Sequence, residues 1–141
     1  MPERSKDWMN QAIKDLKTAE QLIKNESFEW SCFIAQQAAE KAVKAVFQKL
    51  NAVTWGHSIF DLLRVLSQEQ KILVNEDFLN YARSLDKYYL PTRYPNGFAA
   101  GSPYEYFTKK EAEDALIYSR KIIEFCKDLL ARAGKIDQRN P

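Results

Sequence analysis

Hydrophobic residues recur every three or four positions along two long stretches of the chain, residues 3–55 and 104–133, which contain no glycine or proline. Because an α-helix has 3.6 residues per turn, this spacing places the apolar side chains on one helical face. A polar break at residues 24–27 divides the first stretch into two helices. The first carries Trp8, Ala12, Leu16, Ala19 and Ile23, and the second Phe28, Cys32, Ala35, Ala39, Val43, Val46 and Leu50.

Capping residues mark where helices should begin. Ser5 is a suitable N-cap for the first helix. Ser58, followed three residues later by Asp61, predicts the start of a short third helix. Asn75 can cap a fourth helix, which must stop before Pro91 because proline lacks the N–H that continues the helix.

The last third of the chain combines a long connection with one more helix. Residues 91–107 are rich in Pro, Gly and Tyr and predict a loop longer than most, of the kind that often carries function. Thr108 and Glu111 form a capping box for the last helix, which we expect to end at residues 133–134. The sequence therefore predicts an all-α fold, an up-and-down bundle of four to five helices.

Size and composition limit the classes of protein. The 141 residues suit one domain, which we place at residues 1–134, followed by a flexible C-terminal tail at 135–141. A net charge of +2 is too small for binding nucleic acid by charge alone, and no apolar run approaches the roughly 20 residues that cross a bilayer. Cys32 and Cys126 lie in apolar stripes, as reduced core thiols do, so we expect a cytoplasmic protein without membrane contact.

Arg93 is the leading candidate for function. It stands between Pro91 and Pro95, which stiffen the backbone on either side. Three tyrosines flank it in sequence, at Tyr88, Tyr89 and Tyr94. A planar guanidinium among aromatic rings is suited to grip a phosphate or carboxylate and to stack on a ring. The segment therefore indicates recognition of an anion.

A structural role for Arg93 is the alternative. The guanidinium would then pair with Asp86 or Glu40 and pin the loop. His57 is the only histidine, which removes most metal sites and every mechanism that needs two histidines. The chain also lacks the Gly-rich phosphate loops, the Cys-x-x-Cys pair and the His-Glu-x-x-His motif. We therefore expect neither a metal nor a cofactor, and no catalytic residue is assigned.

The second helix carries large apolar side chains on more than one face. Trp30 and Phe33 fall on the same side as Gln37, Lys41 and Lys44, where only polar residues would be expected. A large aromatic pair on a polar face indicates a contact surface, most simply with a second copy of the chain. Trp30, Phe33 and Gln37 are thus the predicted dimer interface. The alternative is that the long loop of the same chain covers the two aromatic rings.

Several segments together resemble a known family. They are residues 8–22, Ser31-Cys-Phe-Ile-Ala-Gln-Gln-Ala-Ala-Glu-Lys-Ala-Val-Lys-Ala, Gly56-His-Ser with Leu62-Leu63, Leu85-Asp-x-Tyr-Tyr, and Arg93-Tyr-Pro. From Ser5 to about Ala131 the chain resembles the HEPN family, the higher eukaryotes and prokaryotes nucleotide-binding domain, in its Arg-Tyr-Pro branch. The resemblance implies a dimerising bundle of about five helices. Such proteins are often encoded beside a minimal nucleotidyltransferase, as toxin and antitoxin or as catalytic and substrate-binding subunits.

The resemblance implies two possible functions. In the ribonuclease branch, an arginine is followed after four to six residues by a histidine, and the pair cleaves RNA without metal. Here Arg93 is followed by Tyr-Pro-Asn-Gly-Phe-Ala-Ala, so no group stands at that position to move the proton, and a toxin-like ribonuclease is the disfavoured alternative. A ribonuclease would then need a substitute base such as His57.

The Arg-Tyr-Pro branch is similar to modules that bind a nucleotide or a nucleotidyltransferase partner, and this is the preferred function. The resemblance implies a module that is not catalytic alone and takes a nucleotide of the ATP or GTP type, or RNA. Its implied site residues are Arg93 on phosphate, Tyr89 or Tyr94 stacked on a base, and Glu40, Lys41 and Asp86 on a polar floor. A third possibility is a pure assembly protein in which Arg93 is a structural clamp.

Overall fold

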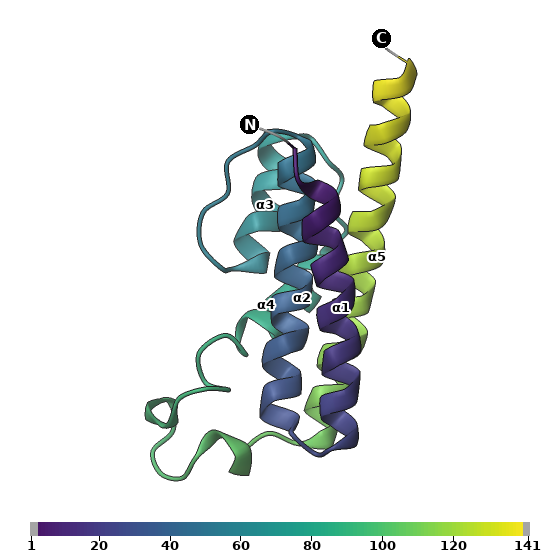
Figure 1. Ribbon diagram of the computed structural model, residues 1–141. Helices are drawn as coiled ribbons and strands as arrows, with labels where there is room; N and C mark the ends of the chain where they lie inside the picture. Colours follow the sequence, from purple (N-terminus) through teal and green to yellow (C-terminus); the bar gives the residue numbers. More distant parts are fainter. Residues whose placement is uncertain (1–2, 140–141) are drawn as a thin grey trace.

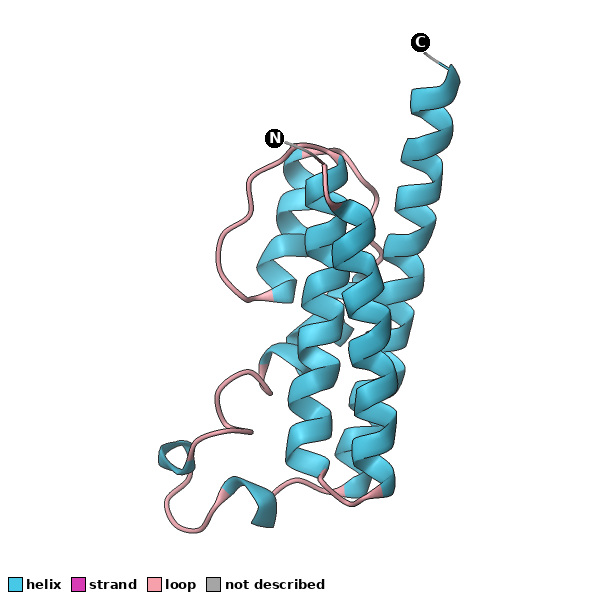
Figure 2. Ribbon diagram, in the orientation of Figure 1, coloured by secondary structure: helices cyan, strands magenta, loops and turns pink. Residues whose placement is uncertain are grey.

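The computed structural model describes residues 3–139 and the side chains up to residue 133. This part of the chain is helical and contains no strand, which confirms the predicted all-α bundle (Figures 1 and 2). The α-helices are α1 (Ser5–Lys24), α2 (Phe28–Lys49), α3 (Ile59–Glu69), α4 (Glu76–Asp86) and α5 (Lys109–Arg139). Two 3-10 turns, η1 (Pro95–Gly97) and η2 (Pro103–Glu105), lie in the predicted loop.

Helix α2 is the centre of the bundle. It runs antiparallel to α1 and packs against both α1 and α5, while α3 and α4 lie along its other side (Figure 1). Neighbouring helices approach α2 closely because its inward positions are small. Five alanines of α2 are fully buried, at Ala35, Ala38, Ala39, Ala42 and Ala45. Together with Val43, Val46 and Phe47, these alanines form the buried face of α2.

Three of the predicted helix starts are present. The Ser58 hydroxyl accepts a hydrogen bond from the backbone N–H of Asp61 at 3.1 Å, and the Asn75 side chain accepts one from the N–H two residues later at 2.8 Å. Thr108 and Glu111 form the reciprocal capping box, with two bonds of 3.1 Å between side chains and backbone. These contacts satisfy N–H groups that have no partner within the first helical turn.

Two predicted boundaries are wrong. Ser5 is already the first residue of α1 and is buried, so Arg4 takes the N-cap position without a side-chain cap. Helix α5 does not end at Gly134 but runs to Arg139, because one glycine costs a long helix only about 1 kcal/mol and removes no hydrogen bond. Residues 140–141 of the predicted tail lie outside the described residues, and its flexibility stays a prediction.

The long segment between α4 and α5 is ordered by its own side chains. The rings of Phe98 and Tyr106 stack with centroids 4.1 Å apart, and the Tyr106 hydroxyl donates to the carbonyl of Ala100. Gly101 has a φ of +82°, and a Cβ there would lie 2.8 Å from a carboxylate oxygen of Glu105. Only glycine therefore fits this turn without moving a neighbour.

Both cysteine thiols are free and buried in the core. Burial raises the pKa of the Cys32 thiol to about 12 and moves the pKa of Cys126 upward as well. The two groups therefore stay protonated at neutral pH. Among the described helices, none has a stretch apolar and long enough to cross a bilayer.

Candidate functional site

Arg93 lies among aromatic rings just beyond α4. Its Nε and Nη2 atoms donate to the carbonyl oxygen of Tyr89 at 2.9 and 2.6 Å. The guanidinium carbon is 4.4 Å from the ring centroid of Phe33, 4.7 Å from that of Tyr89 and 5.1 Å from that of Tyr94. The backbone and three rings thus hold the side chain in place, and none of the ion pairs among the described residues includes Arg93.

The alternative in which Arg93 pairs with Asp86 or Glu40 is wrong, because its guanidinium donates to the carbonyl oxygen of Tyr89 instead. Asp86 instead turns toward the start of α3, where it accepts hydrogen bonds from the Ser58 hydroxyl at 2.8 Å and from the N–H groups of Ile59 and Phe60 at 2.8 and 3.2 Å. Burial is the largest influence and raises the pKa of Asp86, although these three bonds act in the opposite direction. Asp86 therefore joins α4 to α3 and lies outside the Arg93 contacts.

Glu40 is the buried carboxylate of α2 and has three partners of its own. It accepts from the Gln36 amide and from the Lys44 ammonium, each at 3.1 Å. Its second oxygen also lies 3.1 Å from Nδ1 of His57. Because an ionised carboxylate only accepts, Nδ1 of His57 is assigned as the donor in this pair. Glu40 thus orients the imidazole.

Tyr89 connects these two groups. The His57 ring stacks on the Tyr89 ring with centroids 4.7 Å apart and an interplanar angle of 18°. The same Tyr89 contributes the carbonyl and the ring that hold Arg93. Sequence reasoning could not place His57 beside this segment, because the two are far apart in the chain and no spacing rule relates them.

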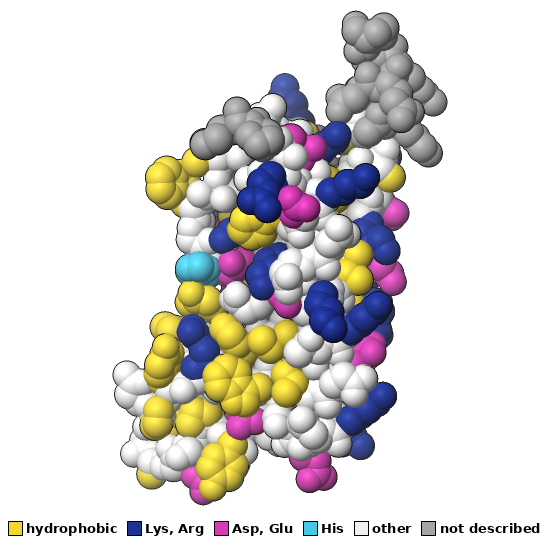
Figure 3. Space-filling view, in the orientation of Figure 1, with side chains coloured by type: hydrophobic (Ala, Val, Ile, Leu, Met, Phe, Trp, Pro, Cys, Tyr) yellow, Lys and Arg dark blue, Asp and Glu magenta, His cyan; other side chains and the backbone are white. Residues whose placement is uncertain are grey.

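The residues around Arg93 form part of an apolar surface. Figure 3 shows hydrophobic side chains gathered over the lower part of α2 and the segment that follows α4, with the histidine, in cyan, at the upper edge. Tyr94 and Leu90 are about half exposed there, at 49% and 57%. We call the set Arg93, Tyr94, Tyr89, Phe33, His57 and Glu40 the arginine site.

Lys41 does not belong to the arginine site. Its ammonium group binds the Asp15 carboxylate of α1 at 2.5 Å. It also lines a hollow on the α1 side with Arg4, Asp7 and Trp8. The structure therefore separates Lys41 from Glu40, because adjacent positions on a helix point about 100° apart.

The predicted interface residues differ in how far they are covered. Phe33 lies under Arg93 and meets Trp30 edge to face, with centroids 6.0 Å apart. Trp30 remains 46% exposed, and the Gln37 amide donates to Gln36 at 2.8 Å. The segment after α4 thus covers Phe33 in part, as the alternative supposed, and leaves Trp30 at the surface.

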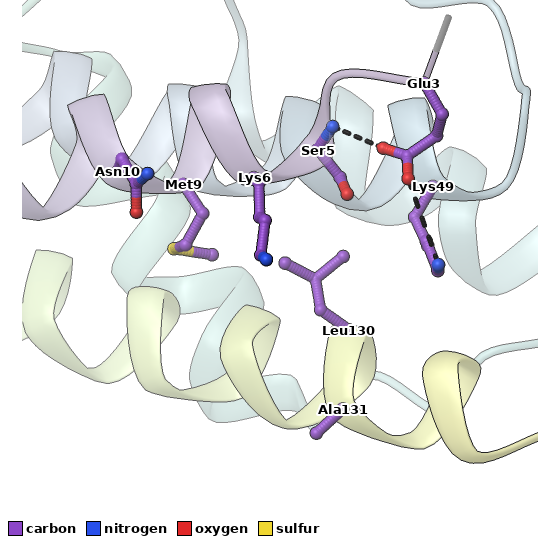
Figure 4. Close-up of a pocket in the computed structure, with 8 residues that line it drawn as sticks. All are labelled: Glu3, Ser5, Lys6, Met9, Asn10, Lys49, Leu130 and Ala131. Atoms are coloured by element: carbon purple, nitrogen blue, oxygen red, sulfur yellow. Dashed lines mark hydrogen bonds and ion pairs between the residues drawn. The ribbon is translucent and has the colours of Figure 1, made fainter.

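A separate hollow of about 510 Å³ opens between α1 and α5 (Figure 4). Lys6 of α1 and Leu130 of α5 point toward one another across it, and Glu3 reaches Lys49 at 3.9 Å. None of the predicted site residues lines this hollow. Among the described side chains, which end at residue 133, no three His, Cys, Asp or Glu residues gather as a metal site would need.

Residues 5–129 match the HEPN domain family. The chain belongs to the HEPN domain family. The match covers α1 to α4, the arginine site and most of α5, and it confirms the resemblance seen in the sequence. One curated relative of this HEPN protein is "Putative toxin MJ1304" of Methanocaldococcus jannaschii, 31% identical over 133 residues that cover 89% of this chain and 88% of the relative.

Solved structures agree with this assignment. TT1696 from Thermus thermophilus has a TM-score of 0.86 at 41% identity, over 91% of this chain and 99% of its own. ST0689, described as an archaeal HEPN homologue, has a TM-score of 0.77 at 36% identity, over 92% and 99%. The HEPN domain protein tm0613 from Thermotoga maritima has a TM-score of 0.73 at 40% identity, over 89% and 98%.

Proposed function

We propose that this HEPN protein is a binding module for a nucleotide of the ATP or GTP type, not catalytic alone, and that the arginine site holds the ligand. One observation carries the proposal. The Arg93 guanidinium is held by a carbonyl oxygen and three rings, and no carboxylate of the described residues neutralises it. A fixed and uncompensated guanidinium is what recognition of a phosphate requires.

The contacts of the site suggest how a nucleotide would lie. Nη1 of Arg93 makes none of the hydrogen bonds of the described residues and is the atom we assign to phosphate. Tyr94 is the better of the two predicted stacking rings, because it is 49% exposed whereas Tyr89 already stacks on His57. The base would therefore lie on Tyr94, with the phosphates toward Arg93.

A thermal-shift titration with ATP and GTP tests the proposal. The wild-type Tm should rise with nucleotide concentration, and Arg93→Ala should abolish the rise. Arg83→Ala is the matched control, because Arg83 also lies over a ring, that of Phe60 at 4.3 Å, but is bound by Glu76. A wild-type protein that neither nucleotide stabilises contradicts the proposal, as does an Arg93→Ala variant that is less stable yet equally protected.

Metal-independent RNA cleavage is the second candidate, and the Glu40–His57 pair favours it. A histidine oriented by a carboxylate can act as a general base, and His57 is half exposed beside the ring that contacts Arg93. His57 would take the proton from an RNA 2′-hydroxyl, whose oxygen would attack the adjacent phosphate and displace the 5′-oxygen, and His57 would return the proton to that leaving oxygen. Arg93 would stabilise the charge that develops on the phosphate. The toxin name of the relative is in keeping with such an activity.

Incubation of excess protein with RNA in EDTA separates the two candidates. Cleavage that His57→Ala and Arg93→Ala both remove supports the ribonuclease. Intact RNA, together with nucleotide protection that depends on Arg93, leaves the binding module.

We also propose that two copies of the chain associate through Trp30, Phe33 and Gln37. A minimal nucleotidyltransferase is the second proposed partner, in the cytoplasm. The half-exposed Trp30 ring supports this surface. Sedimentation at micromolar concentration should give a dimer, and Trp30→Asp should give a monomer. A strictly monomeric wild-type protein contradicts the homodimer, and failure to bind a nucleotidyltransferase encoded beside the gene contradicts that partner.

A further inference from the structure

Gln36 of α2 is a fully buried polar residue that contacts the arginine site from the core. Its Nε2 atom donates to Oε1 of Glu40 at 3.1 Å and to the backbone carbonyl oxygen of His57 at 3.3 Å. Its Oε1 atom accepts a hydrogen bond from the Gln37 amide at 2.8 Å. One side chain thus holds both the carboxylate and the histidine of the site.

The neighbours of Gln36 determine which way its amide points. A side-chain amide has two N–H donors on its nitrogen and an oxygen that only accepts. Both atoms that face Nε2 are acceptors, a carboxylate oxygen and a carbonyl oxygen, so the opposite orientation would place oxygen against oxygen. A buried amide costs free energy unless its polar atoms are paired, and here both of them are.

The segment that carries His57 has few other attachments. Residues 53–57 make no backbone-to-backbone hydrogen bond within the described part of the chain. Gly56, directly before the histidine, has a φ of +75°, and a Cβ there would meet nothing within 4 Å. Gln36 therefore ties the backbone of His57 to α2, while Glu40, four positions further along the same helical face, holds the imidazole at 3.1 Å.

The position of His57 affects Arg93 through Tyr89. The imidazole stacks on the Tyr89 ring, with centroids 4.7 Å apart. The carbonyl oxygen of the same tyrosine accepts both hydrogen bonds from Arg93, and its ring lies 4.7 Å from the guanidinium carbon. If His57 moved away, the Tyr89 ring would lose its stacking partner and could adopt more orientations, and so could the guanidinium beside it.

We propose that Gln36 is the positioning residue of the arginine site. It does not touch the ligand, but holds His57 and Glu40 so that the Tyr89 ring and the Arg93 guanidinium are in place before a nucleotide binds. Binding to a preorganised site loses less conformational entropy, so the affinity for nucleotide depends on Gln36. This effect on affinity rests on the function proposed above, whereas the placement of the imidazole is a property of the protein without ligand.

NMR of the protein without ligand tests the placement of His57. The chain has one histidine, so the imidazole protons give signals that no other residue shares. The wild type should show a nuclear Overhauser effect between these protons and the ring protons of Tyr89. Gln36→Met has a side chain of similar length without the hydrogen bonds, and it should lose this effect. An effect that Gln36→Met retains overturns the proposal.

A matched control separates positioning from stability. Ser31 is also fully buried on α2, and its hydroxyl donates to the carbonyl oxygen of Ala19 at 2.8 Å, on the α1 side. Ser31→Ala should lower the Tm and keep the Overhauser effect. If Gln36→Met does not fold, Gln36→Asn is the second variant, because its shorter amide cannot reach both acceptors and should also lose the effect.

Calorimetric titration with ATP and GTP tests the consequence for binding. The Kd should rise about fivefold in Gln36→Met, which corresponds to the contribution of about one hydrogen bond, and should stay the same in Ser31→Ala. An unchanged Kd in Gln36→Met, or an equal rise in both variants, overturns the positioning role. A wild-type protein that binds neither nucleotide contradicts the proposed function instead, and the Overhauser effect then decides whether Gln36 positions His57.

Discussion

The α3–α4 pair and the arginine site each place an arginine over aromatic rings, yet they treat its charge in opposite ways. In the α3–α4 pair, Arg83 lies 4.3 Å from the Phe60 ring centroid and also binds the Glu76 carboxylate at 3.1 Å. In the arginine site, Arg93 lies over three rings, and its only hydrogen-bond acceptor among the described residues is a carbonyl oxygen. The two side chains look alike in geometry but differ in the charge they leave for a ligand.

The difference shows that an aromatic setting alone does not mark a binding arginine. In the α3–α4 pair, charged groups have partners within the fold. Glu76 binds Arg83, and the Asp86 carboxylate accepts hydrogen bonds at the start of α3. Those contacts stabilise the fold. Arg93 has no carboxylate partner among the described residues, so in the proposed function its charge is available to a phosphate. A candidate binding arginine is therefore distinguished by whether a carboxylate pairs with its guanidinium.

Removal of Asp86 should have the largest effect on stability. Asp86→Ala leaves the Ser58 hydroxyl and two N–H groups at the start of α3 without their acceptor. We expect the free energy of unfolding to fall by about 3 kcal/mol in urea denaturation. Asp86→Asn, which keeps one acceptor oxygen, should lose less. If Asp86→Ala loses no more stability than an exposed control such as Glu113→Ala, the contrast between the two regions is wrong.

Truncation of the rings should affect the two regions differently. Tyr94→Ala removes an exposed ring of the arginine site and should weaken nucleotide binding about tenfold, with little change in Tm. Phe60→Leu removes the ring under Arg83 and should lower Tm while the Kd for nucleotide stays the same. Calorimetric titration and thermal melts of both variants check this. Equal loss of affinity in the two variants would contradict it.

The pH dependence of stability should carry a smaller contribution from Asp86. Its pKa is raised in the folded protein above the ordinary value of 3.8, chiefly by burial, so the folded state holds the proton more tightly than the unfolded state. Between 3.8 and the raised pKa, the free energy of unfolding should therefore fall as pH rises. Asp86→Asn cannot titrate and should lack this component. If the free energies of unfolding of the wild type and of Asp86→Asn change with pH in parallel, the pKa of Asp86 is not raised.

The smallest effect is expected from the exposed ion pair of α4. Glu76→Gln removes the carboxylate of Arg83, and both side chains are largely exposed. The free energy of unfolding should change by less than about 1 kcal/mol. The variant is also informative in binding assays, because it leaves Arg83 over the Phe60 ring without its carboxylate partner. If nucleotide still raises the Tm of the double variant Glu76→Gln with Arg93→Ala, an arginine that lies over a ring without a carboxylate partner is sufficient for nucleotide binding.

Local signals made the fold predictable. The caps at Ser58, Asn75 and Thr108 depend on residues two or three positions away, and the structure contains each of them. The end of α5 was missed because glycine is only a weak helix breaker, so Gly134 did not stop a helix of 31 residues. The bundle thus follows from short-range patterns, with errors at helix ends.

The site was only partly predictable, because its contacts are distant in the chain. Arg93 and its tyrosines were found from their adjacency, and the hydrogen bond from Arg93 to Tyr89 spans only four residues. Asp86, in contrast, finds its partners 26 to 28 residues away at the start of α3. The stack of His57, just before α3, on Tyr89, just after α4, likewise depends on how these two helices are placed, which sequence periodicity does not specify.

The two buried thiols have a practical consequence for studying this protein. Cys32 and Cys126 are sealed in the core and resist ionisation near neutral pH. Maleimide reagents should therefore leave the native protein unmodified, so that a cysteine introduced at Tyr104, which is 69% exposed, would be the single point of attachment. A fluorophore or spin label placed there could report on ligand and on subunit exchange without prior removal of the natural cysteines.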